Sequence, residues 1–305
     1  MWKEVYILLM FQLLWSVIHA NIKLSKAKYL YGIVFGVGGL GSVLGSSFPG
    51  FFAISYGSEN LIFLTLPVYL LLIFAYLKMN HFSSGVTPTE EKDKKGGFLH
   101  GIQLIAKSRF LIFALLIVVF MQMSVAIIDF QFYDFLEKGF GEKDVRTQYA
   151  ARIFGIVHIL TVFFQFIGTY LLIKSIGFLR SHYLIPILLI ISSSLMISVP
   201  IFTIASLSLC TMKLLDFSIF GVVKEMLYVP LKPDEKFRAK AVIDVFAYRT
   251  SKAFASLLIL LVQFVVVEAS QTLAWINIMI AILWIISVSF GLRQYEAMLG
   301  RPNKG

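Results

Sequence analysis

Two basic residues, Arg249 and Lys252, lie three positions apart inside a long apolar stretch near the C-terminus. The stretch begins near residue 239, so at about 1.5 Å per residue both lie roughly 15–20 Å along a helix that is long enough to cross a bilayer. Residues three apart share one helix face. Charges at such depth cost about 2.5–3.5 kcal/mol each and are functional candidates. Arginine and lysine both bind phosphate oxygens, so this pair predicts a site for an anionic ligand.

Acidic residues on neighbouring apolar stretches could instead neutralise Arg249 and Lys252. The candidates are Asp129, Asp216 and Glu225. The two interpretations are compatible, because an ion pair inside a cavity can break when a ligand enters.

Two further charge pairs are close in sequence. Asp244 lies four residues after Lys240, so we expect these two to neutralise each other near one membrane edge. Lys213 and Asp216 are three apart and could do the same. Lys224 is near the end of its stretch, where a long side chain reaches water at little cost, so both a structural and a binding role are open.

The elements that carry these residues are predicted to be membrane-spanning helices. A span takes roughly 20 apolar residues, and about nine stretches qualify. The chain is therefore expected to be an all-α, polytopic membrane helix bundle. The stretches lie near residues 2–20, 29–52, 60–78, 109–130, 150–173, 183–200, 202–228, 239–267 and 271–292.

Basic residues alternate between loops. The positive-inside rule places the basic loops in the cytoplasm, with the N-terminus outside and the C-terminus inside. The loop after the fourth stretch also carries cations, which nearby acids balance. The basic loops carry Lys23, Lys26 and Lys28; Lys92, Lys94 and Lys95; Lys174 and Arg180; and Lys232, Lys236 and Arg238.

Composition agrees with a membrane protein. Hydrophobic residues make up 58% of the chain and charged residues 14%, whereas about a quarter of a soluble protein is charged. The net charge of +10 comes from alternate loops, not one patch, so no nucleic-acid partner is expected.

The chain shows no pattern of a catalytic or metal site. Its only cysteine, Cys210, is in an apolar stretch, and its five histidines are scattered, so neither a metal nor another cofactor is expected. Residues 36–41 match G-x-G-x-x-G inside a span, where small residues at four-residue spacing, such as Gly41 and Gly45, favour close helix packing. We expect no enzyme activity.

One polar segment divides the chain. Residues 79–108 contain serines, a proline, a mixed charge run and a glycine pair, which predict a flexible cytoplasmic linker. Residues 1–78 would then hold three spans of an N-terminal bundle, residues 109–292 a C-terminal six-helix bundle, and residues 293–305 a cytoplasmic tail. This plan resembles the major-facilitator architecture, in which two six-helix bundles meet.

The segment from Lys224 to Ala253, KEMLYVPLKPDEKFRAKAVIDVFAYRTSKA, carries a specific resemblance. It closely resembles the signature of the ATP/ADP translocases of plastids and obligate intracellular bacteria, roughly KEMLYIPL, a charged loop and K-A-x-I-D-V-x-x-x-R-x-x-K. Residues 13–38, LLWSVIHANIKLSKAKYLYGIVFGVG, resemble the family's fourth span and following loop. The matching positions of the signature's second half are Lys240, Ala241, Ile243, Asp244, Val245, Arg249 and Lys252.

The resemblance has departures. Family members carry Asn-Leu-x-Glu followed by Trp-Lys where this chain reads Ile128-Asp129-Phe130-Gln131-Phe132-Tyr133. Asp129 would replace the family glutamate, and the Trp-Lys cation has no counterpart. The chain therefore resembles a divergent branch, and it aligns with the family's fourth to twelfth helices.

The resemblance implies a membrane transporter that exchanges ATP for ADP, or moves a related phosphorylated metabolite, by alternating access. Its substrate-binding residues would be Arg249, Lys252, Asp129, Glu225, Lys224 and Asp244. The alternative is a truncated, non-transporting remnant or accessory membrane protein. A partner subunit would complete the bundle if the chain begins at Met1.

Overall fold

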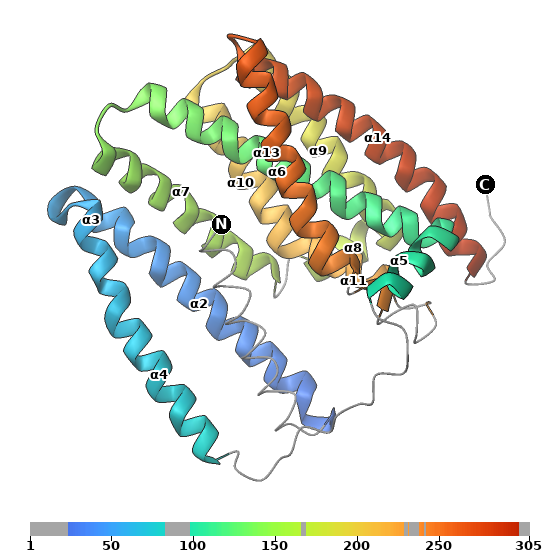
Figure 1. Ribbon diagram of the computed structural model, residues 1–305, viewed down its shortest axis with the longest axis horizontal. Helices are drawn as coiled ribbons and strands as arrows, with labels where there is room; N and C mark the ends of the chain where they lie inside the picture. The colour runs from blue at the N-terminus through green and yellow to red at the C-terminus, as the bar shows by residue number, and fades with distance from the viewer. Residues whose placement is uncertain are drawn as a thin grey trace.

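The computed structural model describes residues 24–82, 98–165, 169–228, 231, 238–240 and 242–298, and their regular structure is entirely helical. The first predicted span, residues 2–20, lies outside them. Figure 1 shows a helical hairpin beside a larger bundle. The hairpin comprises α2 (Leu24–Tyr56), α3 (Ser58–Leu61) and α4 (Thr65–Phe82). The bundle comprises α5 (Phe98–Lys107), α6 (Arg109–Gly139), α7 (Lys143–Phe163), α8 (Thr169–Ile176), α9 (Phe178–Ser198), α10 (Phe202–Leu215), α11 (Gly221–Leu227), α13 (Tyr248–Val265) and α14 (Ala269–Met298).

Two helices of the bundle contain π-helical segments. The segment η3 (Asp216–Phe220) continues α10 into α11, and η4 (Val242–Ala247) precedes α13. A π-helical turn is uncommon and often occurs at a functional site.

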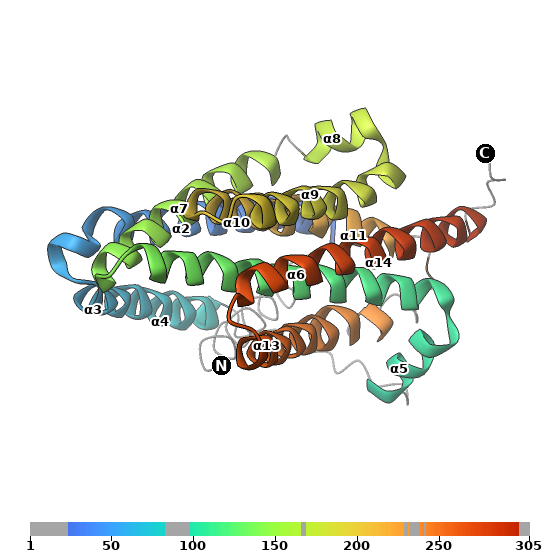
Figure 2. The ribbon, with the colours of Figure 1, turned by 90° about the horizontal axis from the view of Figure 1, so that it is seen from above.

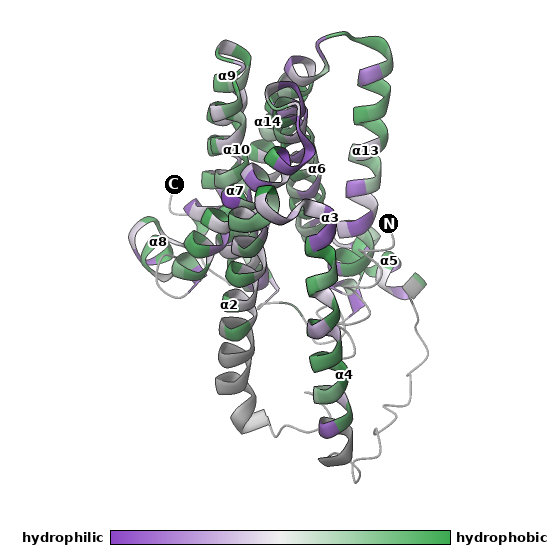
Figure 3. Ribbon diagram, turned by 90° about the vertical axis from the view of Figure 1, so that its left-hand side faces the viewer, coloured by the Kyte–Doolittle hydropathy of each residue, from purple (hydrophilic) through white to green (hydrophobic). Residues whose placement is uncertain are grey.

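Seven described helices are long and apolar enough to cross a membrane. They correspond to seven of the predicted spans, and Figure 3 shows hydrophobic colour over most of α4 and α13. The predicted span at 150–173 is divided between α7 and α8 and is not among the seven. The seven are Val37–Tyr56, Ser58–Lys78, Arg109–Gly139, Leu179–Ser198, Phe202–Leu227, Arg238–Val265 and Ala269–Ala297.

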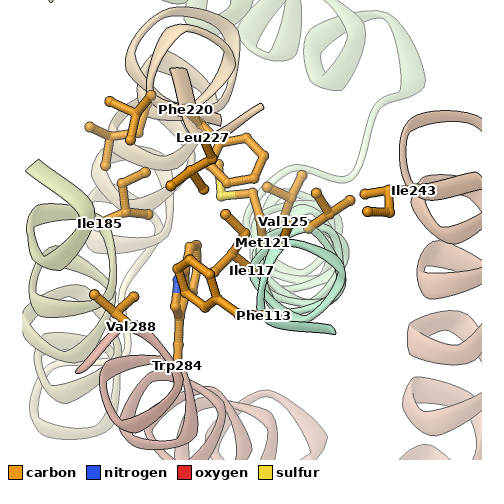
Figure 4. Packing of buried hydrophobic residues seen from close by; sticks show 14 of the residues in the cluster. Phe113, Ile117, Met121, Val125, Ile185, Phe220, Leu227, Ile243, Trp284 and Val288 are labelled. Carbon is orange, nitrogen blue, oxygen red and sulfur yellow. The ribbon is translucent and has the colours of Figure 1, made fainter. Parts of the chain in front are cut away.

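Helix α6 is the centre of the bundle. Its first turn is capped by Ser108, whose hydroxyl accepts a hydrogen bond from the amide of Leu111 at 3.3 Å. The helix then contacts α5, α7, α10, α13 and α14. Figure 4 shows apolar side chains of α6, such as Phe113 and Met121, packed against Trp284 of α14 and Phe220 beside α11. A helix that contacts this many neighbours needs apolar side chains on several faces, and α6 is mostly apolar apart from a few buried polar residues such as Gln122 and Gln131.

Helix α7 joins the two parts. It packs along α2, and less extensively on α10 (Figure 1). The close approach occurs at two glycines: a Cβ on Gly39 would lie 2.9 Å from Val162, and one on Gly50 would lie 3.3 Å from the backbone of Arg152. Arg152 Nε also donates to the Gly50 carbonyl at 2.9 Å. The predicted contact at Gly41 and Gly45 is wrong, since nothing lies within 4 Å of a Cβ there.

Charges at the loop after α6 pair across the hairpin and the bundle. Lys143 Nζ lies 2.6 Å from Glu59 Oε1, and the amide and hydroxyl of Ser58 donate to Asp144 at 2.8 and 2.6 Å. These hydrogen bonds hold the pKa of Asp144 below its ordinary value. The predicted balance of cations by acids in this loop is confirmed.

The predicted linker is partly structured. Residues 79–82 belong to α4, and residues 98–107 form α5, which has one strongly apolar face, so these parts of the predicted linker are not a flexible loop. Gly101 permits this packing, because a Cβ there would lie 2.9 Å from the carbonyl oxygen of Arg238. The division of the chain into two bundles stays a prediction.

Gly291 of α14 offers a test of the α6–α14 contact. A Cβ at this position would lie 2.1 Å from the ring of Phe113, and overpacking a tight site costs about 1–3 kcal/mol. We expect Gly291→Ala to lower the melting temperature in detergent, whereas Gly45→Ala, with open space at its Cβ, leaves it unchanged. Equal melting temperatures for the two variants would contradict this packing.

Candidate functional site

Charged and amide side chains from α6, α10 and η3 meet inside the bundle. Lys213 Nζ of α10 lies 2.7 Å from Asp129 Oδ2 of α6. Gln122 Nε2, two turns earlier on α6, donates to Asp216 Oδ1 of η3 at 3.2 Å. The side chain of Lys213 is only 10% exposed, and it lies near the middle of the candidate span Phe202–Leu227. The pairing with Asp129 therefore keeps a buried cation compensated.

Lys252 of α13 completes this group, which we call the charge cluster: Gln122, Asp129, Lys213, Asp216 and Lys252. Its positive charge acts on both aspartates at longer range, whereas the ion pair closer than 4 Å in this cluster is Lys213–Asp129. The Lys252 ammonium lies 5.1 Å from the centre of the Tyr248 ring, within the range of a cation–π contact.

Arg249 also lies near Tyr248. Its guanidinium carbon is 6.0 Å from the centre of the ring, at the limit of a cation–π contact. Tyr248 is four residues before Lys252 and was not predicted to take part, although this spacing on a helix is a usable sequence signal.

The charges of the charge cluster cancel, but not all of its hydrogen-bond acceptors have a donor. Its two lysines offset its two aspartates. Yet Asp129 Oδ1 and Gln122 Oε1 are buried and have no hydrogen-bond partner among the described residues. Buried acceptors without donors are costly. The cluster can therefore accept another donor, or exchange a carboxylate for a different anion at its lysines.

A second group of charges lies where α11 meets the segment that precedes α13. Lys224 Nζ is 2.8 Å from Asp244 Oδ1, and Lys240 Nζ is 2.5 Å from Glu225 Oε2. The hydroxyl of buried Tyr228 donates to Asp244 at 3.4 Å. These contacts tie α11 to the start of the next helix. We call this group of five residues the end network.

The structure corrects both local pairs expected from the sequence. Asp244 pairs with Lys224, and Lys240 with Glu225, so the predicted Asp244–Lys240 pair is wrong. Lys213 bonds Asp129, while Asp216 takes a hydrogen bond from Gln122. In each case a partner on another helix offers a shorter contact than the neighbour along the chain.

The six predicted site residues thus divide between two places. The structure brings Asp129 and Lys252 into the charge cluster, with Arg249 one turn away on α13. Lys224, Glu225 and Asp244 are in the end network. Asp244 precedes Lys252 by eight residues, which is about 12 Å along a helix.

Two family profiles match the chain. The Major Facilitator Superfamily profile matches residues 10–231, and the TLC ATP/ADP transporter profile matches residues 204–295. The chain belongs to the major facilitator superfamily, and its C-terminal part matches the TLC ATP/ADP transporter profile. The second match contains the end network and, apart from Gln122 and Asp129, the charge cluster.

Individual relatives carry the same family name. The ADP,ATP carrier protein 1 of Rickettsia typhi is 23% identical, over 99% of this chain and 68% of its own length. The ADP,ATP carrier protein 2 of Chlamydia pneumoniae is 37% identical, over 26% of this chain and 15% of its own. No solved structure matches. The predicted helical membrane fold is confirmed, and this chain is an integral membrane transporter of the major facilitator superfamily.

The ion pair of the charge cluster gives a stability test. Removing one partner of a buried pair costs up to about 3–5 kcal/mol, whereas replacing both is often neutral. We therefore expect Asp129→Asn to lower the melting temperature and the double variant Asp129→Asn with Lys213→Met to recover most of the loss. Lys143→Met, in an exposed pair, serves as the control and should change little. Additive losses in the double variant would contradict the pairing.

Proposed function

We propose that this transporter exchanges ATP for ADP, or moves a related phosphorylated metabolite, by alternating access. The supporting observation is the charge cluster: two lysines on different helices, both near the middle of spans, of which Lys213 forms an ion pair with Asp129 and Lys252 lies beside the ring of Tyr248. In this proposal the charges of the site cancel when no substrate is bound. When the aspartates move away from the lysines, the site becomes positively charged and can bind an anionic substrate. Lysines that exchange a carboxylate for a phosphate behave in this way.

Each predicted residue has a role in this proposal. Arg249 and Lys252 bind the phosphate oxygens, and Asp129 holds Lys213 until substrate arrives. Lys224, Glu225 and Asp244 contact substrate only when the pairs of the end network open. Because both cations of that network are engaged in the closed form, an anion must displace a carboxylate to reach them.

The membrane context completes the proposal. We place the N-terminus outside and the C-terminus in the cytoplasm because of the basic loops. We place the protein in a bacterial inner membrane because the similar carrier proteins come from bacteria. The protein performs no chemical conversion of its substrate. Membership of a transporter family does not favour the alternative of a non-transporting remnant.

Lys252 is the first residue to test. A hydrogen bond to a charged group is worth about 1.5–3 kcal/mol, so Lys252→Ala should reduce apparent substrate affinity at least about tenfold and abolish measurable uptake at low concentration. Uptake of labelled ATP, ADP and other phosphorylated metabolites into producing cells measures this, with membrane levels compared by immunoblot. Lys138→Ala, which removes an exposed lysine on the far end of α6, is the control. Full uptake by Lys252→Ala would exclude this role.

A charge exchange tests the end network. Lys224→Asp should lose uptake, and we expect the added change Asp244→Lys to restore the melting temperature without restoring uptake, because a substrate-binding cation has moved to another helix. Uptake and thermal stability of the three proteins are compared in the same vesicles. Recovery of transport together with stability would show that Lys224 and Asp244 only hold the helices together.

A further inference from the structure

An apolar groove lies on the other side of α13 from the charge cluster. Its volume is about 490 Å³, within the range of ligand pockets. Helices α5, α6 and α13 surround it, at the edge of the bundle seen in Figure 2. The lining residues include Ile102 and Ile105 of α5, Val119 and Met123 of α6, and Phe246 and Phe254 beside or on α13.

The groove offers no polar atom to a ligand. Two hydroxyl residues are part of the lining, but both hydroxyls turn to their own helix. Thr250 donates to the carbonyl of Phe246 at 2.9 Å, and Ser251 donates to the carbonyl of Ala247 at 2.6 Å. A polar ligand would lose its hydrogen bonds with water and gain none here. Only hydrocarbon suits this lining.

The depth of the groove matches one leaflet. Along α6 its lining runs from Leu115 to Met123, eight residues or about 12 Å. Half of a hydrocarbon core of about 30 Å is about 15 Å. Met123 is 14 residues, or about 21 Å, beyond Arg109. The groove therefore ends near the bilayer centre if Arg109 lies about 6 Å outside the hydrocarbon, at the level of the lipid headgroups.

Two basic residues lie at the turn between α5 and α6, and the first of them follows the lining residue Ile105 by two positions. Lys107 ends α5 and Arg109 begins α6, and both are exposed. The sequence from residue 94 to residue 128 contains no acidic residue. Loop charge places this end of α6 in the cytoplasm, where the leaflet carries anionic lipids.

We propose that the groove binds one acyl chain of an anionic phospholipid whose headgroup lies against Lys107 and Arg109. The acyl chain would pack against α13 on the face opposite Lys252, next to the apolar side chains of α5. Gly101 makes this position of α5 possible, since a Cβ there would lie 2.7 Å from Val242 and push α5 away. Lipid binding itself is independent of the proposed transport function; only its effect on Lys252 rests on it.

Native mass spectrometry of the whole chain, delipidated and then given phosphatidylglycerol or phosphatidylcholine of identical acyl chains, tests the proposal. We expect a retained phosphatidylglycerol adduct. Val119→Trp, which fills the groove, should remove the adduct, and Leu71→Trp, on the exposed surface of α4, should not. Gly101→Val should also remove the adduct, because it displaces α5 from the groove without filling the groove.

The headgroup contact is tested separately. The double variant Lys107→Gln with Arg109→Gln should lower the preference for phosphatidylglycerol about 30-fold, at about fivefold per cation. Arg180→Gln, an exposed cation on α9, should leave it unchanged. Adducts that survive both Val119→Trp and Gly101→Val would overturn the proposal. So would equal retention of the two lipids, or a dimer that Val119→Trp dissociates, which would assign the groove to a second copy.

Discussion

The structure depends on charge compensation inside hydrocarbon. Lys213 and Lys252 lie near mid-span, where an uncompensated cation is expensive and water cannot relieve it. Asp129 on α6 and Asp216 beside α10 supply the opposite charge. Because these partners are on different helices, the requirement for neutrality fixes how α6, α10 and α13 face one another. Ion pairs of this kind stabilise a bundle only while every member has its partner.

Helix α6 makes that arrangement rigid. Its apolar faces pack on α14 and beside α11 (Figure 4), while Gln122 and Asp129 reach the charge cluster. The same helix also lines the apolar groove on a further face. Helices α6 and α13 thus carry residues of both the charge cluster and the groove. A shift of α13 would therefore change the geometry of both sites.

The sequence predicted the elements well where hydrophobic length alone decides them. Seven spans match candidate membrane helices. The weakest correspondence, at 150–173, falls on α7, which carries Lys143, Arg146 and Arg152 in its first half. The error over α5 has a related cause: residues 98–107 were included in a linker because of the charges before them, although Ile102 and Ile105 place apolar side chains one turn apart.

The sequence by itself determined which residues are charged within the membrane, because a polar side chain in an apolar run is visible in one dimension. It also showed the resemblance to ATP/ADP transporters, through the segment from Lys224 to Lys252, which the matching TLC profile contains. Only the tertiary structure decided the partners. Lys213 forms an ion pair with Asp129, and Lys224 forms one with Asp244, although other acidic residues are nearer along the chain. Helix packing and the π-helical turns set those distances, and sequence spacing describes contacts within one regular helix only.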